Sequence, residues 1–110
     1  MSLIQREKRV GLHLPVEVHG EDASGARFTE VTRSVNVSGG GILFESHRRI
    51  PVGTRLRLSI ELPVSLRHHF GDREIYKARA VVCRVERAEG DAVSRIGARF
   101  LGEASSSAEE

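Results

Sequence analysis

The run Asn36-Val37-Ser38-Gly39-Gly40-Gly41 holds the residues of this chain that are best suited to binding a ligand. Asn and Ser side chains are short donors and acceptors that can bond to the backbone or to the edge of a ligand. Three consecutive glycines allow positive φ and a close approach of a ligand to the backbone. β-rich and apolar runs flank the segment, so we expect a turn between two strands. Taken alone, the pattern fits a structural β-bulge or hairpin turn equally well.

A second candidate is the basic segment Gln5-Arg6-Glu7-Lys8-Arg9, which directly precedes the first predicted strand. Arginine pairs with phosphates through a planar fork and stacks on bases. A mobile arginine arm beside a rigid polar turn could clamp a small anionic ligand, with the arm on the phosphates and the turn on base edges. The alternative for this segment is a disordered terminus without a role in binding.

Catalytic and metal chemistry find little support in the sequence. Ser38 has no convincing His and acid partners, and its glycines open a strand, which is the wrong context for a phosphate-binding loop. His68 and His69 are adjacent and are expected on a surface loop rather than at a metal. Cys83 matches no metal spacing and is predicted to be a buried structural thiol. We therefore predict neither a catalytic residue, a metal site nor a cofactor.

Alternation of apolar and polar residues predicts six strands and almost no helix. Pro15 predicts that the first strand is an edge or contains a bulge, and residues 64–73 are expected to form a basic connection. This pattern indicates an all-β sandwich or small barrel, and closure into a barrel is favoured because it removes sheet edges. The strands are expected over residues 12–19, 28–37, 42–45, 55–62, 75–87 and 95–100.

Length and composition are those of one ordinary globular domain, with 110 residues of which 39% are apolar and 29% charged. No apolar run approaches the roughly 20 residues that a membrane helix needs, and the start shows no signal peptide. We therefore expect a cytoplasmic protein without membrane insertion. The net charge is +2, from 17 Lys and Arg against 15 Asp and Glu, and it mildly favours an anionic partner.

The spacing Asn36-x-Ser38-x-x-Gly41 resembles the Asp/Asn-x-Ser-x-x-Gly motif of the PilZ domain, the bacterial receptor module for cyclic di-GMP. Three further segments resemble the family at the corresponding places. Residues 9–16 are similar to its first strand, 50–54 to the segment before the fourth strand, and 96–100 to the end of the domain. The resemblance spans residues 5 to 101, nearly the whole domain.

The resemblance implies a six-stranded antiparallel barrel of PilZ type over residues 10–102, preceded by a flexible basic arm, 1–9, and followed by a short disordered polar tail, 103–110. It also implies a ligand site. In the family, arginines of the N-terminal motif contact phosphates and stack on guanine, while the Asn or Asp and the Ser bond the guanine and the backbone. The residues implied here are Arg6, Arg9, Asn36, Ser38 and Gly41, with Gln5, Lys8, Gly39 and Gly40 as a second group.

The arginine motif departs from the family pattern Arg-x-x-x-Arg, because Gln5 stands four residues before Arg9 and Arg6 only three. Arg6 is the candidate substitute. The favoured hypothesis is a non-enzymatic cyclic di-GMP receptor that orders its arm on binding and signals to a protein partner. Gln5 favours the alternative, a PilZ-like interaction domain that does not bind the nucleotide. Homodimerisation is compatible with either hypothesis.

A third alternative is a barrel that binds RNA or another single strand. Such sites usually stack bases on exposed aromatic side chains. This chain has only five aromatic residues, and most of them lie in the apolar phase of the predicted strands: Phe28, Phe44, Phe70, Tyr76 and Phe100. We therefore expect no nucleic-acid polymer as a partner.

Overall fold

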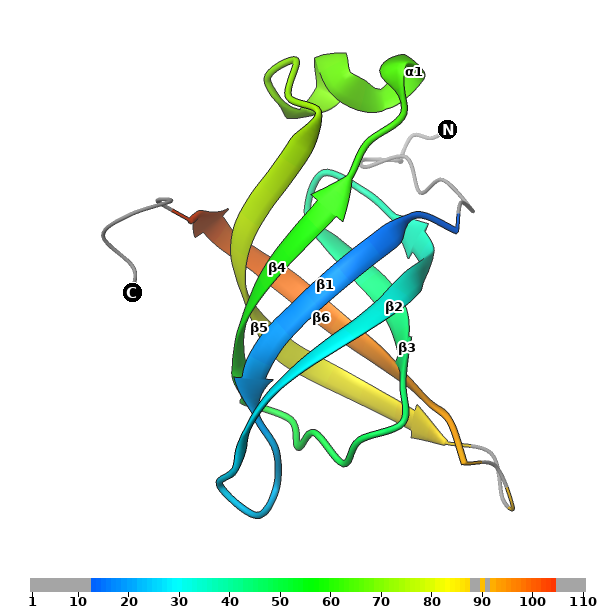
Figure 1. Ribbon diagram of the computed structural model, residues 1–110, viewed down its shortest axis with the longest axis vertical. Coiled ribbons are helices and arrows are strands. Elements are labelled where there is room, and N and C mark those ends of the chain that lie inside the picture. Colours follow the sequence, from blue (N-terminus) through cyan, green and yellow to red (C-terminus); the bar gives the residue numbers. More distant parts are fainter. Residues whose placement is uncertain (1–12, 88–89, 91, 105–110) are drawn as a thin grey trace, which may run out of the picture.

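The computed structural model describes residues 13–87, 90 and 92–104, and these form a closed antiparallel barrel of six strands (Figure 1). The predicted six-stranded antiparallel barrel is confirmed. Around the barrel the strands follow the order β1-β2-β3-β6-β5-β4, so that each strand has two hydrogen-bonded neighbours. Their bounds are β1 Pro15–Glu21, β2 Arg27–Val37, β3 Gly41–Ser46, β4 Arg55–Glu61, β5 Ile75–Arg87 and β6 Ser94–Glu103.

The core is the set of inward side chains that the strand alternation supplies. Every second residue of β1 and β4 is apolar and buried, and β3, β5 and β6 add further side chains to the same cluster. Fully burying a Val, Leu or Ile side chain contributes about 1.5–3 kcal/mol, so this cluster is the main source of stability. The largest fully buried apolar side chains are those of Val16, Val18, Phe44, Leu58, Ile60, Val82 and Ile96.

A short helical segment covers one end of the barrel, where the sequence predicted only a connection. Helix α1 (Val64–Arg67) begins after Pro63 and continues into the 3₁₀ turn η1 (His68–Phe70), and both lie at the top of Figure 1. Leu66 is buried in the core cluster. The segment is too short to show a helical period in the sequence, and its packing against the barrel end decides its conformation.

Two predictions about single residues in the strands are wrong. Pro15 begins β1, but β1 is not an edge strand, because β2 and β4 flank it. A proline is tolerated there because the β1–β4 ladder starts only at Val16. Cys83 is exposed rather than buried. It is the extra residue of a bulge between Val82 and Arg84 and points out of the barrel, with its Sγ 3.4 Å from the carbonyl oxygen of Gly97.

The ends of the domain differ in part from the predicted division. Strand β6 continues through Glu103, so the first residue of the predicted tail belongs to the barrel. The predicted arm, 1–9, and the tail from residue 105 lie outside the described residues. Within the described part of the chain, no helix is long and apolar enough to cross a membrane.

Candidate ligand site

A bulge in β2 turns Asn36 toward the outside of the barrel. In the first part of β2 the even-numbered residues, such as Phe28 and Ser34, face inward. If the alternation continued, Asn36 would point into the core. The register between β2 and β3 instead shifts between Ser34 and Asn36, with Val35 as the extra residue. Val37 consequently enters the core, at 2% exposure, and Asn36 lies partly exposed on the outer face.

The turn between β2 and β3 is held by its own hydrogen bonds. The Ser38 N–H donates to the carbonyl oxygen of Gly41 over 2.9 Å, and the Ser38 hydroxyl accepts a 3.2 Å bond from the Gly40 N–H. The Gly40 carbonyl accepts a 2.9 Å bond from Phe100 of β6. Ser38 is only 7% exposed. The turn is therefore a rigid part of the barrel end.

Gly41 is required by close packing against β6 and not by an unusual backbone angle. A Cβ at Gly41 would lie 2.6 Å from the carbonyl oxygen of Ala98, which is closer than real Cβ atoms come. Its φ does not lie in the positive region, and neither does that of Gly39. Gly39 has open space around its Cα and is exposed. Gly39 and Gly41 thus have different roles, and that of Gly41 is steric.

The chain enters the barrel beside this turn. The Leu14 N–H donates to the Ser34 hydroxyl, the Ser34 N–H donates to the Leu14 carbonyl, and both bonds measure 2.9 Å. The His13 Nδ1 atom lies 3.0 Å from the Ser34 carbonyl oxygen. Ser34 is fully buried. Residues 13 and 14 are therefore anchored two positions before Asn36.

Of the predicted site residues, Asn36, Ser38, Gly39, Gly40 and Gly41 lie together at this end of the barrel. The predicted arm residues lie outside the described residues: Gln5, Arg6, Lys8 and Arg9.

The sequence analysis missed one candidate, Arg99. This residue is exposed on β6 and pairs directly with Gly41 in the β3–β6 ladder. Among the described residues, the guanidinium of Arg99 makes no ion pair or hydrogen bond. In the sequence, the alternation of the last strand already places Arg95 and Arg99 on its outer face, and this was the signal that could have identified Arg99. Only the barrel topology, however, places β6 beside the turn.

Metal binding finds no support among the described residues. They contain no group of three His, Cys, Asp or Glu side chains that could hold a metal ion. His68 and His69 are exposed in η1, with their ring centroids 4.0 Å apart. At this end of the barrel, the groups that could contact a ligand are the Asn36 amide, the Ser38 hydroxyl, the exposed backbone of the turn and the Arg99 guanidinium.

The PilZ domain family matches residues 4–110 of the sequence, which is almost the entire chain. The chain belongs to the PilZ domain family. PilZ domains are non-catalytic receptor modules for cyclic di-GMP, so the prediction of a non-enzymatic protein is confirmed. No curated protein matches the sequence.

Solved structures show the same fold. The Bacillus subtilis inhibitor of motility MotI/DgrA superposes with a TM-score of 0.68 at 23% identity, covering 96% of this chain and 46% of the other. The PilZ domain of Escherichia coli YcgR with cyclic di-GMP gives 0.58 at 18% identity, over 90% and 79%. The PilZ domain of CeSA from a cellulose-synthesizing bacterium gives 0.55 at 18%, over 88% and 83%. The PilZ chain thus spans about half the length of the Bacillus subtilis protein.

Proposed function

We propose that this PilZ domain binds cyclic di-GMP at the turn that contains Asn36, Ser38 and Gly41, and that binding orders the N-terminal arm over the nucleotide. The observation that carries the proposal is the convergence of three features at one barrel end. These are the outward Asn36, the rigid Ser38–Gly41 turn and the anchored entry of the chain at Ser34.

The hydrogen bonds of His13 and Leu14 to Ser34 fix the start of the N-terminal arm close enough to Asn36 for its arginines to reach a ligand there. Arg9 precedes His13 by four residues, and an extended chain spans at most about 3.3–3.6 Å per residue. Arg9 can thus reach about 14 Å from His13, whose ring lies against the Ser34 carbonyl oxygen. Arg6 has a longer reach. The arginines of the arm are therefore tethered within range of a ligand on Asn36, and their forks suit its phosphates.

Arg99 supports the same proposal from the barrel side. It is an exposed cation directly opposite Gly41 in the β3–β6 ladder. A guanidinium fixed on a strand can pair with a phosphate at a smaller cost in entropy than one on a terminal arm. We propose that Arg99 compensates for Gln5, which cannot supply a charged fork.

The second candidate function is a protein-interaction domain that does not bind the nucleotide, and Gln5 is the residue that favours it. Signalling to a protein partner and a cytoplasmic location belong to the proposal in either form, because the module is of a second-messenger family.

Titration calorimetry with cyclic di-GMP tests the proposal. We expect saturable heat for the unchanged protein and binding weakened about tenfold or more by Arg99→Gln, the scale of a hydrogen bond to a charged group. Arg95→Gln is the matched control, because Arg95 is an exposed arginine in outward phase on the same strand. Absence of heat at high ligand concentration would establish the interaction-only alternative.

A further inference from the structure

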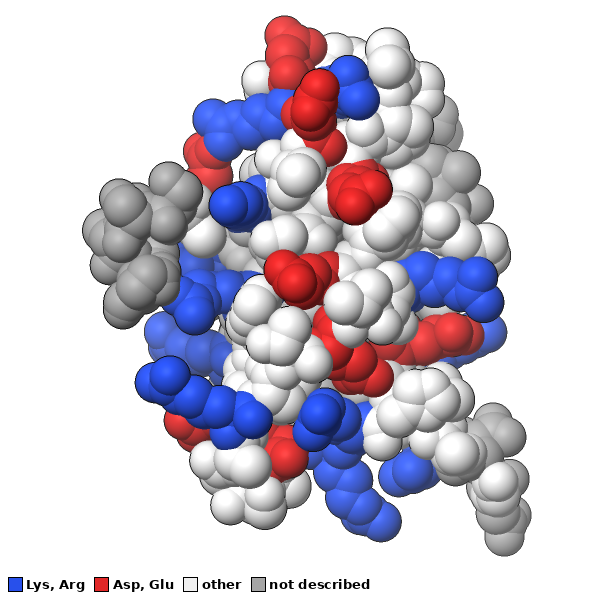
Figure 2. Space-filling view, viewed as in Figure 1, with Lys and Arg blue, Asp and Glu red and all other residues white. Residues whose placement is uncertain are grey.

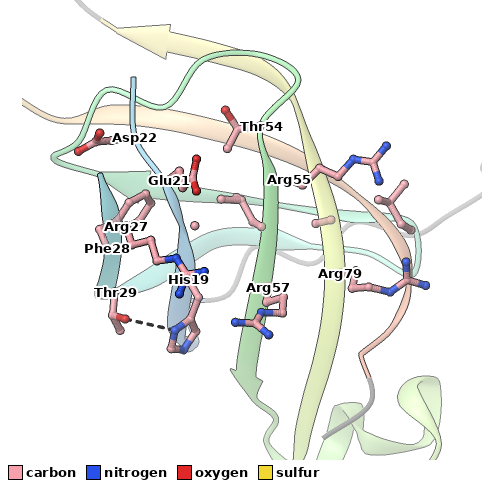
Figure 3. Close-up of a pocket in the computed structure, with 14 residues that line it drawn as sticks. His19, Glu21, Asp22, Arg27, Phe28, Thr29, Thr54, Arg55, Arg57 and Arg79 are labelled. Atoms are coloured by element: carbon pink, nitrogen blue, oxygen red, sulfur yellow. Dashed lines mark hydrogen bonds between the residues drawn. The ribbon is translucent and has the colours of Figure 1, made fainter. Parts of the chain in front are cut away.

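A shallow groove lies where β1 ends and β2 and β4 begin, and it extends over β5 to Leu101 of β6. Its volume is about 940 Å³, and Figure 3 shows the arginines that flank it. One wall is a row of outward side chains at directly paired positions, Thr29, His19, Arg57 and Arg79, on four adjacent strands. Arg55 also lines the groove, two residues before Arg57 and on the same face of β4. We call this the arginine groove.

Two arginines of this groove occupy directly opposed positions, where antiparallel sheets usually avoid like charges. Arg57 and Arg79 are directly opposite each other in the β4–β5 ladder. Like charges at such positions destabilise a sheet. Arg55 and Arg79 make no ion pair or hydrogen bond within the described part of the chain. A Cβ at Gly102 would lie 3.0 Å from the Arg79 guanidinium, so the glycine leaves room for that cation.

The acids that line the groove make no ion pair with Arg55 or Arg79 within the described part of the chain. Glu21 and Asp22 lie at the β1 end, and Asp22 is engaged in its own turn. The bond from the Ser24 hydroxyl is the main cause that lowers the pKa of the Asp22 carboxyl, and backbone N–H groups and Arg48 act in the same direction. Blue side chains accordingly gather at the lower left of Figure 2, over the β4–β5 side of the barrel.

An apolar contact lies beside the cations. Leu101 lines the groove next to Arg79, and it is 37% exposed although it belongs to a strand. It is the extra residue where the β5–β6 register shifts, because Arg79 pairs with Gly102 and Ala80 with Phe100. The bulge therefore turns a leucine outward beside three arginines.

The shape and chemistry of the groove match an acidic peptide better than a nucleic acid or a membrane. Nucleic acid strands bind to exposed aromatic faces, whereas Phe28, the aromatic residue of this groove, is 7% exposed and has Arg48 over its ring at 4.7 Å. A membrane surface needs a face without acids, and Glu21 lies at one end of the groove. Carboxylates alternating with an apolar residue satisfy both the arginine forks and Leu101.

We propose that the arginine groove is a docking site for an acidic segment of a partner protein, whose carboxylates pair with Arg55 and Arg79 and whose apolar side chain packs on Leu101. The proposal does not depend on nucleotide binding, because the groove shares no residue with the Asn36–Gly41 turn or with Arg99.

Fluorescence anisotropy tests this proposal without cyclic di-GMP, so its outcome is independent of the nucleotide titration. The probe is a short fluorescein-labelled peptide in which pairs of glutamates flank leucines. The comparison is between the unchanged protein, the double variant R55Q/R79Q and the double variant R87Q/R95Q, which removes two exposed arginines from the far ends of β5 and β6. We expect saturable binding that weakens at least tenfold in R55Q/R79Q and less than twofold in R87Q/R95Q.

Melting temperatures separate a lost contact from a lost fold. R55Q/R79Q should melt at or near the temperature of the unchanged protein, because Arg55 is exposed and Arg79 faces a like charge at the opposed position. Equal weakening by both double variants would overturn the proposal, as would equal binding of a peptide with Gln in place of Glu. Binding of single-stranded RNA or of phosphatidylserine vesicles in preference to the acidic peptide would overturn it as well.

Discussion

The turn at one end of the barrel and the arginine groove on its side are two polar regions built in opposite ways. At the turn the backbone is specialised: a bulge re-aims Asn36, the Ser38 hydroxyl is bonded internally, and Gly41 lies against the backbone of β6. In the groove most strand positions follow a regular ladder, and the side chains are specialised. Changes at the turn should therefore lower stability together with binding, whereas changes in the groove should weaken binding with little effect on stability.

Gly41→Val should give the largest loss of stability. The new Cβ would meet the Ala98 carbonyl oxygen at 2.6 Å, and overpacking against backbone costs about 1–3 kcal/mol, with the branched side chain at the upper end. Urea unfolding measures the change. Gly39→Ala is the control, because its Cβ enters open space, and its free energy of unfolding should stay within about 0.5 kcal/mol. Equal stability of the two variants would contradict the steric role of Gly41.

Arg9→Ala should weaken cyclic di-GMP binding without a loss of stability, in contrast to the variants of the turn. We expect it to lose about 1.5–3 kcal/mol of cyclic di-GMP affinity, the scale of a hydrogen bond to a charged group, with no change in melting temperature. Calorimetry and a thermal melt of the same protein measure the two quantities. Affinity equal to that of the unchanged protein would show that Arg9 is not at the site.

Gln5→Arg and Arg6→Ala together identify the second arginine of the arm. If Gln5 leaves one phosphate weakly bound, Gln5→Arg should tighten cyclic di-GMP binding by about 1–2 kcal/mol through a new fork. If Arg6 already takes that place, Gln5→Arg should do little and Arg6→Ala should weaken binding by a similar amount. No effect of either variant in a protein that binds the nucleotide would remove the arm from the site.

Ser38→Ala should reveal the internal bond of the turn. Without the hydroxyl, the Gly40 N–H loses its acceptor, and we expect about 1 kcal/mol less stability together with weaker nucleotide binding. Ser65→Ala is a suitable control, because Ser65 is exposed and belongs to α1 and not to the turn. A loss of affinity without any loss of stability would mean that the hydroxyl serves the ligand alone.

Arg79→Gln should change the free energy of unfolding less than the other variants, and the sign of this change is informative. Relief of the Arg57–Arg79 repulsion should raise the free energy of unfolding by up to about 0.5 kcal/mol, and less at high salt because screening already weakens that repulsion. Urea unfolding at low and high ionic strength measures this difference. A clear loss of stability would mean that the arginine holds the barrel together and is not kept for a partner.

Much of the fold could be predicted from local patterns. Apolar alternation in segments such as Leu56 to Leu62 identified the strands, because the period of a strand is two and one face of each must be buried. The cap formed by α1 and η1 escaped prediction, since a few residues carry no period. Cys83 was assigned to the core because its neighbours are apolar, although Ala78, Ala80 and Val82 face inward and the period of two therefore places residue 83 outside.

By itself, the sequence determined the six strands, the closed all-β class and the polar turn from Asn36 to Gly41, because these depend on side-chain period and on residue types within a short stretch. The tertiary structure alone decided which way Asn36 points, why Gly41 has no side chain, and that Arg99 stands opposite it. It also aligned Arg57 with Arg79 across two strands. Each of these depends on the register between segments far apart in the chain, and register is set only when the whole barrel closes.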